Sequence, residues 1–147
     1  MMDKHNNRLS MVMESLSQNE SLARTLVSAF IAPLDPSVDV LTDIKTAVSE
    51  AVTNAVIHGY KGGKGEITLS MSLADGELCV TVSDKGVGIS DIERAMEPLF
   101  TTSKPEMERA GMGFTVMESF MDKVKVTSFP GQGTTIEMIK DLNNAAS

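Results

Sequence analysis

Alternation of apolar and polar residues over 67–83 is the clearest pattern in the chain. From 67 to 73 the odd-numbered residues are Ile, Leu or Met, and the even-numbered residues are Thr or Ser. The alternation resumes over 78–83, after the turn-forming pair Asp75-Gly76. A period of two places the apolar side chains on one face of a strand, so this segment predicts a β-hairpin with one buried face. Other apolar runs predict further strands over 9–16, 124–128 and 134–140.

Apolar residues spaced three and four apart predict three main helices. The first spans about 20–32 and is preceded by Asn19, a residue type that caps helices. The second spans about 38–58, and the third spans about 112–122. A shorter helix is expected over about 90–96.

The order of these elements predicts a single α/β domain. A chain of 147 residues is long enough to bury one core, and no linker, repeat or low-complexity run divides it. We expect a two-layer sandwich, with helices covering one face of a mixed, largely antiparallel sheet. Residues 1–7 and 142–147 are polar and are expected to fray.

Composition and charge exclude several classes of protein. The formal net charge of −7 argues against binding to nucleic-acid phosphates, which requires a basic face. The single cysteine, Cys79, cannot form a disulfide framework or a thiolate metal cluster. No apolar run approaches the length that spans a membrane, and the sequence shows no signal-peptide pattern. A cytoplasmic protein that binds neither nucleic acid nor membrane is the simplest expectation.

The second predicted helix carries three polar residues on one face. Glu50, Asn54 and His58 are four residues apart, and an apolar stripe lies beside them. Gly59 follows, where we expect a left-handed cap to end the helix. Polar groups at the edge of a core need partners, because leaving them unpaired there is costly. Taken alone, an ordinary polar margin of a buried helix is the simpler interpretation.

A short glycine-bearing segment, Asp84 to Ile89, follows the second strand of the hairpin. An aspartate there can accept a hydrogen bond from an exocyclic amine, and Gly86 and Gly88 leave room for a flat ring to approach the backbone. These are the requirements of adenine recognition. A Gly-x-Gly pair by itself more often marks a tight turn, and the chain has neither the dinucleotide-binding fingerprint nor a Walker motif.

A second pair of glycines, Gly111 and Gly113, lies at the expected start of the third helix. Backbone N–H groups at a helix N-terminus attract anions, and the helix dipole adds to the attraction. A polar loop expected over 97–110 precedes them and supplies hydroxyl groups and cations. These residues are Thr101, Thr102, Ser103, Lys104 and Arg109. A surface loop before a flexible helix start is the alternative interpretation.

Three segments, taken together and in this order, resemble a known ATP-binding domain. They are SEAVTNAVIHGY (49–60), DKGVGI (84–89) and PLFTTSKPEMERAGMGFTVMESFMD (98–122). The chain resembles the domain shared by gyrase, the Hsp90 chaperones, histidine kinases and the MutL proteins, and within that group the small anti-sigma-factor serine kinases. The resemblance extends over about residues 9–140. Ser103 and Ala110 depart from the family pattern, which bears on the expected contacts of the loop.

The resemblance implies a role for each polar or glycine residue of these segments. Glu50 would be the general base that takes the proton from a serine hydroxyl. Asn54 would hold Mg²⁺ through its side-chain oxygen. Asp84 would bind the adenine amine of ATP or ADP, and His58 would be structural. The remaining nucleotide contacts would come from Gly86, Gly88, Thr102, Lys104, Gly111 and Gly113.

The resemblance also implies protein partners. The chain would bind and inhibit a sigma factor of the sigma-F type, which acts in sporulation, and would phosphorylate a serine of the anti-anti-sigma antagonist. It would form a homodimer. Glu20 and Arg24, four residues apart on the first helix, would join Arg109 in a charged docking surface for both partners. The alternative for Glu20 and Arg24 is a surface salt bridge of small energetic value.

Three other functions compete with this interpretation. A histidine kinase would need a phosphoacceptor histidine on a dimerisation helix, and the chain has only His5 and His58. A non-catalytic module that binds a sigma factor in a nucleotide-dependent way would have no use for a base at Glu50. A related general-stress anti-sigma kinase is an alternative of the same class.

Overall fold

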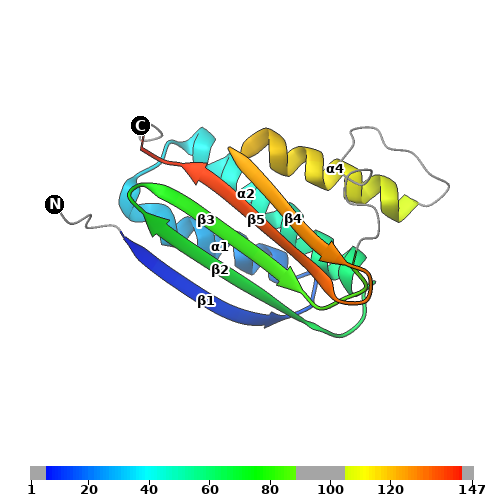
Figure 1. Ribbon diagram of the computed structural model, residues 1–147. Helices are drawn as coiled ribbons and strands as arrows, with labels where there is room; N and C mark the ends of the chain where they lie inside the picture. The colour runs from blue at the N-terminus through cyan, green and yellow to red at the C-terminus, as the bar shows by residue number, and fades with distance from the viewer. Residues whose placement is uncertain (1–5, 89–104, 144–147) are drawn as a thin grey trace.

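The protein is described by a computed structural model (Figure 1) that covers residues 6–88 and 105–143, with the backbone alone for 105–112. Its sheet has five strands in the order β1-β2-β3-β5-β4, and every pairing is antiparallel. The sheet expected to be mixed is therefore entirely antiparallel among the described residues. The strands are β1 (Asn7–Glu14), β2 (Glu66–Ala74), β3 (Glu77–Asp84), β4 (Lys123–Phe129) and β5 (Gly133–Asp141).

The helices lie together on one face of this sheet. Figure 1 shows α1 and α2 behind the strands and α4 at the β4 side of the sheet, packed against α2, so the chain forms the expected two-layer α/β sandwich. Helix α1 packs against α2, and α2 packs against α4. None of the helices in the described part of the chain is long and apolar enough to cross a membrane. The helices are α1 (Asn19–Ile31), the short 3₁₀ helix η1 (Ala32–Leu34), α2 (Val38–Asn54), the π-helix η2 (Ala55–Gly59) and α4 (Pro105–Phe120).

The hairpin of β2 and β3 confirms the alternation in the sequence. Ala74 pairs with Glu77, so Asp75 and Gly76 form a two-residue loop. Both loop residues have positive φ, 52° and 81°, as in a type I′ turn, which matches the twist of the strands. The apolar residues of both strands form the centre of the core. They are Ile67, Leu69, Met71, Leu73, Leu78, Val80 and Val82.

Two helix starts differ from the expected ones. Asn19 does not cap α1, because its side-chain N–H donates to the Glu14 carbonyl at 2.8 Å and ties the end of β1 to the helix. Helix α4 begins at Pro105 rather than near 112. Proline is favourable in a first turn, where its missing N–H has no helical partner to lose. The helix expected over 90–96 lies outside the described residues.

The second predicted helix is regular only as far as Asn54. Ser37 caps its N-terminus by accepting a hydrogen bond from the Val40 N–H at 3.3 Å. Beyond Asn54 the helix widens into η2, where the Tyr60 N–H donates to the Ala55 carbonyl at 3.0 Å. A π-helical turn of this kind is frequent at functional sites, so the end of α2 is a natural place to look for one.

Candidate active site

Glu50 and Asn54 lie one turn apart on α2, where α4 packs against it. Glu50 is partly buried, and Asn54 is buried with 5% of its surface exposed. Gly113 of α4 faces Glu50, because a Cβ atom added at residue 113 would lie 3.2 Å from Oε2 of Glu50. The structure therefore brings Gly113 against Glu50, one turn from Asn54, and the missing side chain at Gly113 allows this close approach.

The surroundings of Glu50 raise the pKa of its carboxyl above the ordinary value. Burial is the larger cause, and the negative charge of Glu20 on α1 adds to it. A higher pKa makes the carboxylate a better proton acceptor, as a general base near neutral pH requires. The position of Glu50 therefore suits proton transfer better than a fully solvated glutamate would.

Glu20 is held beside this helix by two partners. The Ser49 hydroxyl of α2 donates to Oε1 of Glu20. Nε of Arg24 lies 3.2 Å from the same oxygen, so the expected ion pair is present. Ser49 directly precedes Glu50 in the chain, and the Arg24 side chain is 41% exposed. The ion pair thus joins an accessible cation to the immediate surroundings of Glu50.

Asp84 is the last residue of β3, and only 6% of its surface is exposed. Burial raises the pKa of its carboxyl, and hydrogen bonds from the backbone N–H groups of Gly86 and Thr134 oppose the shift. The Gly86 N–H donates to Oδ1 at 2.9 Å. A carboxylate held this far from water gains stability from any further donor, such as a ligand amine.

The segment after Asp84 lies against η2 and the turn between β4 and β5. A Cβ atom added at Gly86 would lie 1.9 Å from the Gly59 carbonyl oxygen, which accepts a hydrogen bond from the Val87 N–H at 2.9 Å. Gly88 has a φ of +75°, and a Cβ atom there would lie 2.2 Å from the Phe129 carbonyl oxygen. The missing side chains make room for the protein's own backbone, and the expected approach of a flat ring stays a prediction.

Gly59 does not form the expected left-handed cap. Positive φ occurs later, at Lys61 (52°) and Gly62 (77°). A Cβ atom added at Gly59 would instead lie 2.7 Å from Oδ1 of Asp84. Residue 59 is therefore glycine because the Asp84 carboxylate occupies the place of its side chain.

The remaining predicted residues have mixed outcomes. Gly111 and Gly113 lie inside α4 and not at its N-terminus, so the helix-end argument for anion binding fails for them. Their contact with a phosphate stays a prediction. Thr102 and Lys104 lie outside the described residues, and so does the side chain of Arg109.

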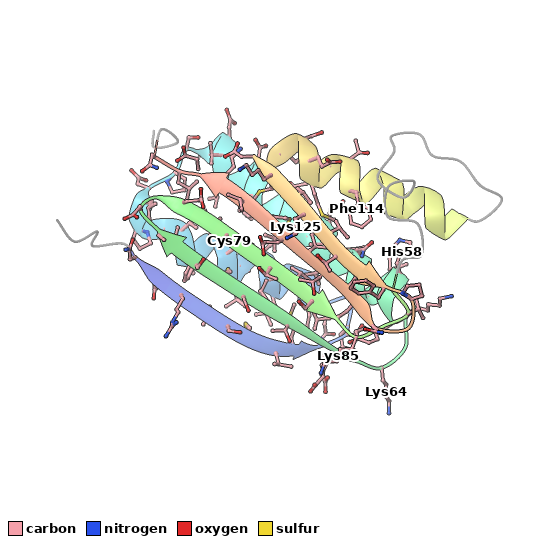
Figure 2. All side chains as sticks on the ribbon, viewed as in Figure 1. His58, Lys64, Cys79, Lys85, Phe114 and Lys125 are labelled. Carbon is pink, nitrogen blue, oxygen red and sulfur yellow. The ribbon has the colours of Figure 1, made fainter. Side chains whose placement is uncertain are left out.

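His58 lies in η2 and is partly buried near the end of the sheet (Figure 2).

Two other residues near the site, Ser49 and Tyr60, are not predicted as site residues by the sequence patterns. The Tyr60 hydroxyl accepts a hydrogen bond from the Lys85 N–H at 2.7 Å, next to Asp84. Glu20 is 29 residues from Ser49 and Lys85 is 25 residues from Tyr60, so no local pattern reveals these two contacts. The only signal was that Tyr60 is the one tyrosine of the chain.

The donor set around Asn54 limits the cation that could bind. In the described ranges, no group of three or more His, Cys, Asp or Glu side chains could hold a metal ion. One amide oxygen near a carboxylate suits Mg²⁺, which keeps several waters and takes other oxygens from a phosphate ligand. The residues present therefore fit a magnesium ion that arrives with a phosphate, and not one held by the protein alone.

Comparison with known proteins agrees with this geometry. Residues 13–140 match the family of histidine kinase-like ATPase domains. The chain is 55% identical over 140 residues to an anti-sigma F factor of Bacillus licheniformis and 54% identical to that of Bacillus subtilis, covering 95% of each chain. It is 56% identical over 139 residues to the anti-sigma F factor of Pasteuria penetrans, covering 92% of this chain and 91% of that one.

Several solved structures share the fold. The RsbU and RsbW domains of a Mycobacterium tuberculosis protein match with a TM-score of 0.65 at 22% identity, covering 95% of this chain and 34% of that one. A blue-light activated histidine kinase of Erythrobacter litoralis matches with a TM-score of 0.55 at 28% identity, covering 74% and 32%. The catalytic domain of the histidine kinase ThkA matches with a TM-score of 0.55 at 18% identity, covering 90% and 96%.

Proposed function

The chain belongs to the anti-sigma F factor family, with a histidine kinase-like ATPase domain, and on this premise we propose that it is a serine kinase that also inhibits a sporulation sigma factor. As a kinase-type ATPase it binds nucleotide. Its partners would be a sigma factor of the sigma-F type and the anti-anti-sigma antagonist, whose serine it would phosphorylate and which it would thereby inactivate. We expect it to act as a homodimer in the cytoplasm.

The observation that carries the kinase proposal is the position of Glu50, a partly buried carboxylate between α2 and α4 whose pKa is raised. The carboxylate lies against the backbone of Gly113, one of the glycines proposed to contact the phosphates, so the base would stand close to the reacting phosphate. The serine oxygen would attack the γ-phosphorus of ATP, and the bond from phosphorus to the β,γ-bridging oxygen would break and release ADP. The serine proton would pass to Glu50, whose raised pKa favours uptake.

The nucleotide would lie between Asp84 and α2. Asp84 would accept a hydrogen bond from the adenine amine, which suits a buried carboxylate with unused acceptor capacity. The amide oxygen of Asn54 would hold Mg²⁺, which neutralises charge on the phosphates. Further nucleotide contacts are proposed for Gly86, Gly88, Thr102, Lys104, Gly111 and Gly113.

Glu20, Arg24 and Arg109 form the proposed docking surface. Arg24 is accessible, and its ion pair with Glu20 is linked through Ser49 to the helix of the proposed base. A protein partner that contacts this pair would lie next to the reacting groups. Sigma factor and antagonist would therefore compete for overlapping surfaces.

Transfer of labelled γ-phosphate from ATP to a serine-bearing antagonist tests this function directly. The wild-type protein should label the antagonist, should not label one whose serine is replaced by alanine, and should bind the sigma factor.

Asp84→Ala should abolish the binding of ATP and ADP alike, because it removes the adenine contact. Replacing Asn54 should weaken binding mainly in the presence of Mg²⁺.

A protein that binds ATP and sigma factor but transfers no phosphate would contradict the kinase proposal. That outcome would favour the non-catalytic, nucleotide-dependent binding module.

A further inference from the structure

Tyr60 joins two strands at the adenine end of the proposed site. The Lys85 N–H donates to its hydroxyl oxygen at 2.7 Å, and the hydroxyl donates to the Glu66 carbonyl at 2.6 Å. Glu66 is the first residue of β2, and Lys85 follows the last residue of β3. One side-chain hydroxyl therefore connects the backbones of both strands, as donor to one and acceptor from the other.

This bridge stands where the ladder of β2 and β3 would otherwise continue. Ile67 pairs with Asp84, so Glu66 and Lys85 would be the next partners. The hydroxyl is inserted between their backbone groups, which keeps the two strands apart at this point. Figure 2 shows Lys85 at this end of the sheet, as it shows Lys64. Beyond Lys85 the chain leaves the sheet and turns onto Gly59.

The ring of Tyr60 is fixed by its neighbours. A Cβ atom added at Gly65 would lie 2.3 Å from Cε1 of the ring, so the ring occupies the side-chain position of Gly65. Gly59, directly before Tyr60, provides the space for the Asp84 carboxylate. Gly59 therefore contacts the Asp84 carboxylate, and Tyr60 holds the backbone N–H of the next residue, Lys85.

We propose that the Tyr60 hydroxyl is a positioning group that acts through the Lys85 backbone. By holding the Lys85 N–H, it fixes the direction of the neighbouring Asp84 carboxylate and thereby the preference of the site for adenine over guanine. This inference rests on the proposed role of Asp84. Adenine presents an amine where guanine presents a carbonyl oxygen. A carboxylate in a fixed direction accepts from the amine and repels the carbonyl, whereas a carboxylate free to turn away discriminates less.

Tyr60→Phe tests the inference, because it removes the hydroxyl and keeps the ring against Gly65. The Kd for ADP should rise about three- to tenfold, because a less firmly oriented carboxylate must be ordered when the nucleotide binds. The Kd for GDP should change less, so the ratio of the two affinities falls. Titration calorimetry without partner proteins measures both. The Lys85 amide of the nucleotide-free variant should also exchange its hydrogen faster than in the wild type.

Asn143→Ala is the matched control. The Asn143 side chain donates from Nδ2 to the Asp75 carbonyl at 3.2 Å, so it holds the same hairpin at its opposite end. This variant should lose about as much thermal stability as Tyr60→Phe, and both losses should be small. Its affinities for ADP and GDP should equal those of the wild type.

Two outcomes separate this inference from the proposed function. If Asp84→Ala loses ADP binding while Tyr60→Phe keeps the wild-type ratio of ADP to GDP affinity, the role of Tyr60 is overturned and the nucleotide site stands. If Asp84→Ala binds ADP normally, the adenine assignment is wrong and the inference falls with it.

Discussion

The two ends of the proposed nucleotide site are built differently. At the end of β3, backbone lies against backbone, with residues 85–88 seated on Gly59 and on the turn between β4 and β5. Between α2 and α4, a side chain of one helix faces the bare backbone of the other at Gly113. The first arrangement has no room for an added atom, whereas the second places a titratable carboxylate against the opposite helix. Recognition suits the first end, and reaction suits the second.

The two carboxylates show the same contrast. Burial raises the pKa of both Asp84 and Glu50. At Asp84, backbone N–H groups oppose the shift because they stabilise the negative charge in place. At Glu50, the charge of Glu20 adds to the shift and favours proton uptake. One carboxylate is arranged as a fixed acceptor, and the other is arranged to receive a proton.

The largest expected effect comes from the part of the proposed site between α2 and α4, where Glu50 lies. Glu50→Gln keeps the shape of the side chain and removes the base, so the rate of phosphate transfer should fall by about 10²–10⁴-fold. The affinity for ADP should stay at the wild-type value, because the adenine end is untouched. Single-turnover transfer from labelled ATP and calorimetry with ADP measure the two quantities on one preparation.

Asp39→Asn is the control for this change, because it neutralises an exposed carboxylate in the first turn of the same helix. It should transfer phosphate at the wild-type rate. A Glu50→Gln protein with near wild-type activity would remove the base from the mechanism.

At the end of β3 we expect the opposite result: adding one methyl group should weaken ADP binding, which Glu50→Gln leaves unchanged. Gly86→Ala would place Cβ 1.9 Å from the Gly59 carbonyl oxygen, so the backbone must shift. We expect a loss of about 1–3 kcal/mol in the free energy of unfolding and an affinity for ADP that is lower by about tenfold or more. Thermal unfolding and calorimetry measure the two effects.

Gly62→Ala separates packing from backbone strain. Residue 62 has a φ of +77° and no atom within 4 Å of an added Cβ. Alanine there should cost about 1–2 kcal/mol of stability through its left-handed backbone and leave ADP binding intact. Equal ADP affinities for Gly86→Ala and the wild type would show that the tight packing has no part in recognition.

Local periodicity was sufficient to predict much of this arrangement. Alternation over 67–83 predicted the hairpin that ends at Asp84, and its turn lies at the expected residues. Spacing by four placed Glu50 beside Asn54 and paired Glu20 with Arg24, because both relations depend only on helical geometry. These features need no knowledge of the tertiary fold.

Contacts between distant segments could not be predicted in this way. Gly59 was read as a helix cap, but it is glycine because Asp84, far along the chain, fills its side-chain position. The sequence predicts a helix start at the glycines of α4, whereas Gly113 lies within the helix, where an added Cβ atom would lie 3.2 Å from Oε2 of Glu50. In both cases the reason for the glycine lies on another element.

The proposed docking surface, which lies beside Glu50, supplies a prediction of intermediate size. Arg24→Ala and Arg109→Ala should each weaken the binding of sigma factor and antagonist by about tenfold, as for a moderately important interface residue. ATP binding should be unchanged. Arg8→Ala is the control, since Arg8 is exposed on β1. If both partner activities survive in the two variants, the docking surface lies elsewhere.

The smallest expected effect concerns stability and pH. The pKa of Glu50 is raised in the folded protein above its ordinary value of 4.5. Ionisation of this carboxyl therefore opposes folding: stability is lost as the pH rises from about 4.5 through the folded-state pKa, and the loss persists above it. Glu50→Gln removes this ionisation. Relative to the wild type, its melting temperature should be higher at pH 7 than at pH 4, by less than about 4 °C because the group is only partly buried.

Thermal unfolding of both proteins at the two pH values measures this difference of differences. A relative gain at pH 7 that disappears at pH 4 means that the charge of Glu50 is kept against the preference of its surroundings, as a base for catalysis would be. Equal differences at both pH values would mean that α4 and Glu20 do not disfavour the charge. Glu50 would then be an ordinary surface carboxylate, and the contrast with Asp84 would rest on packing alone.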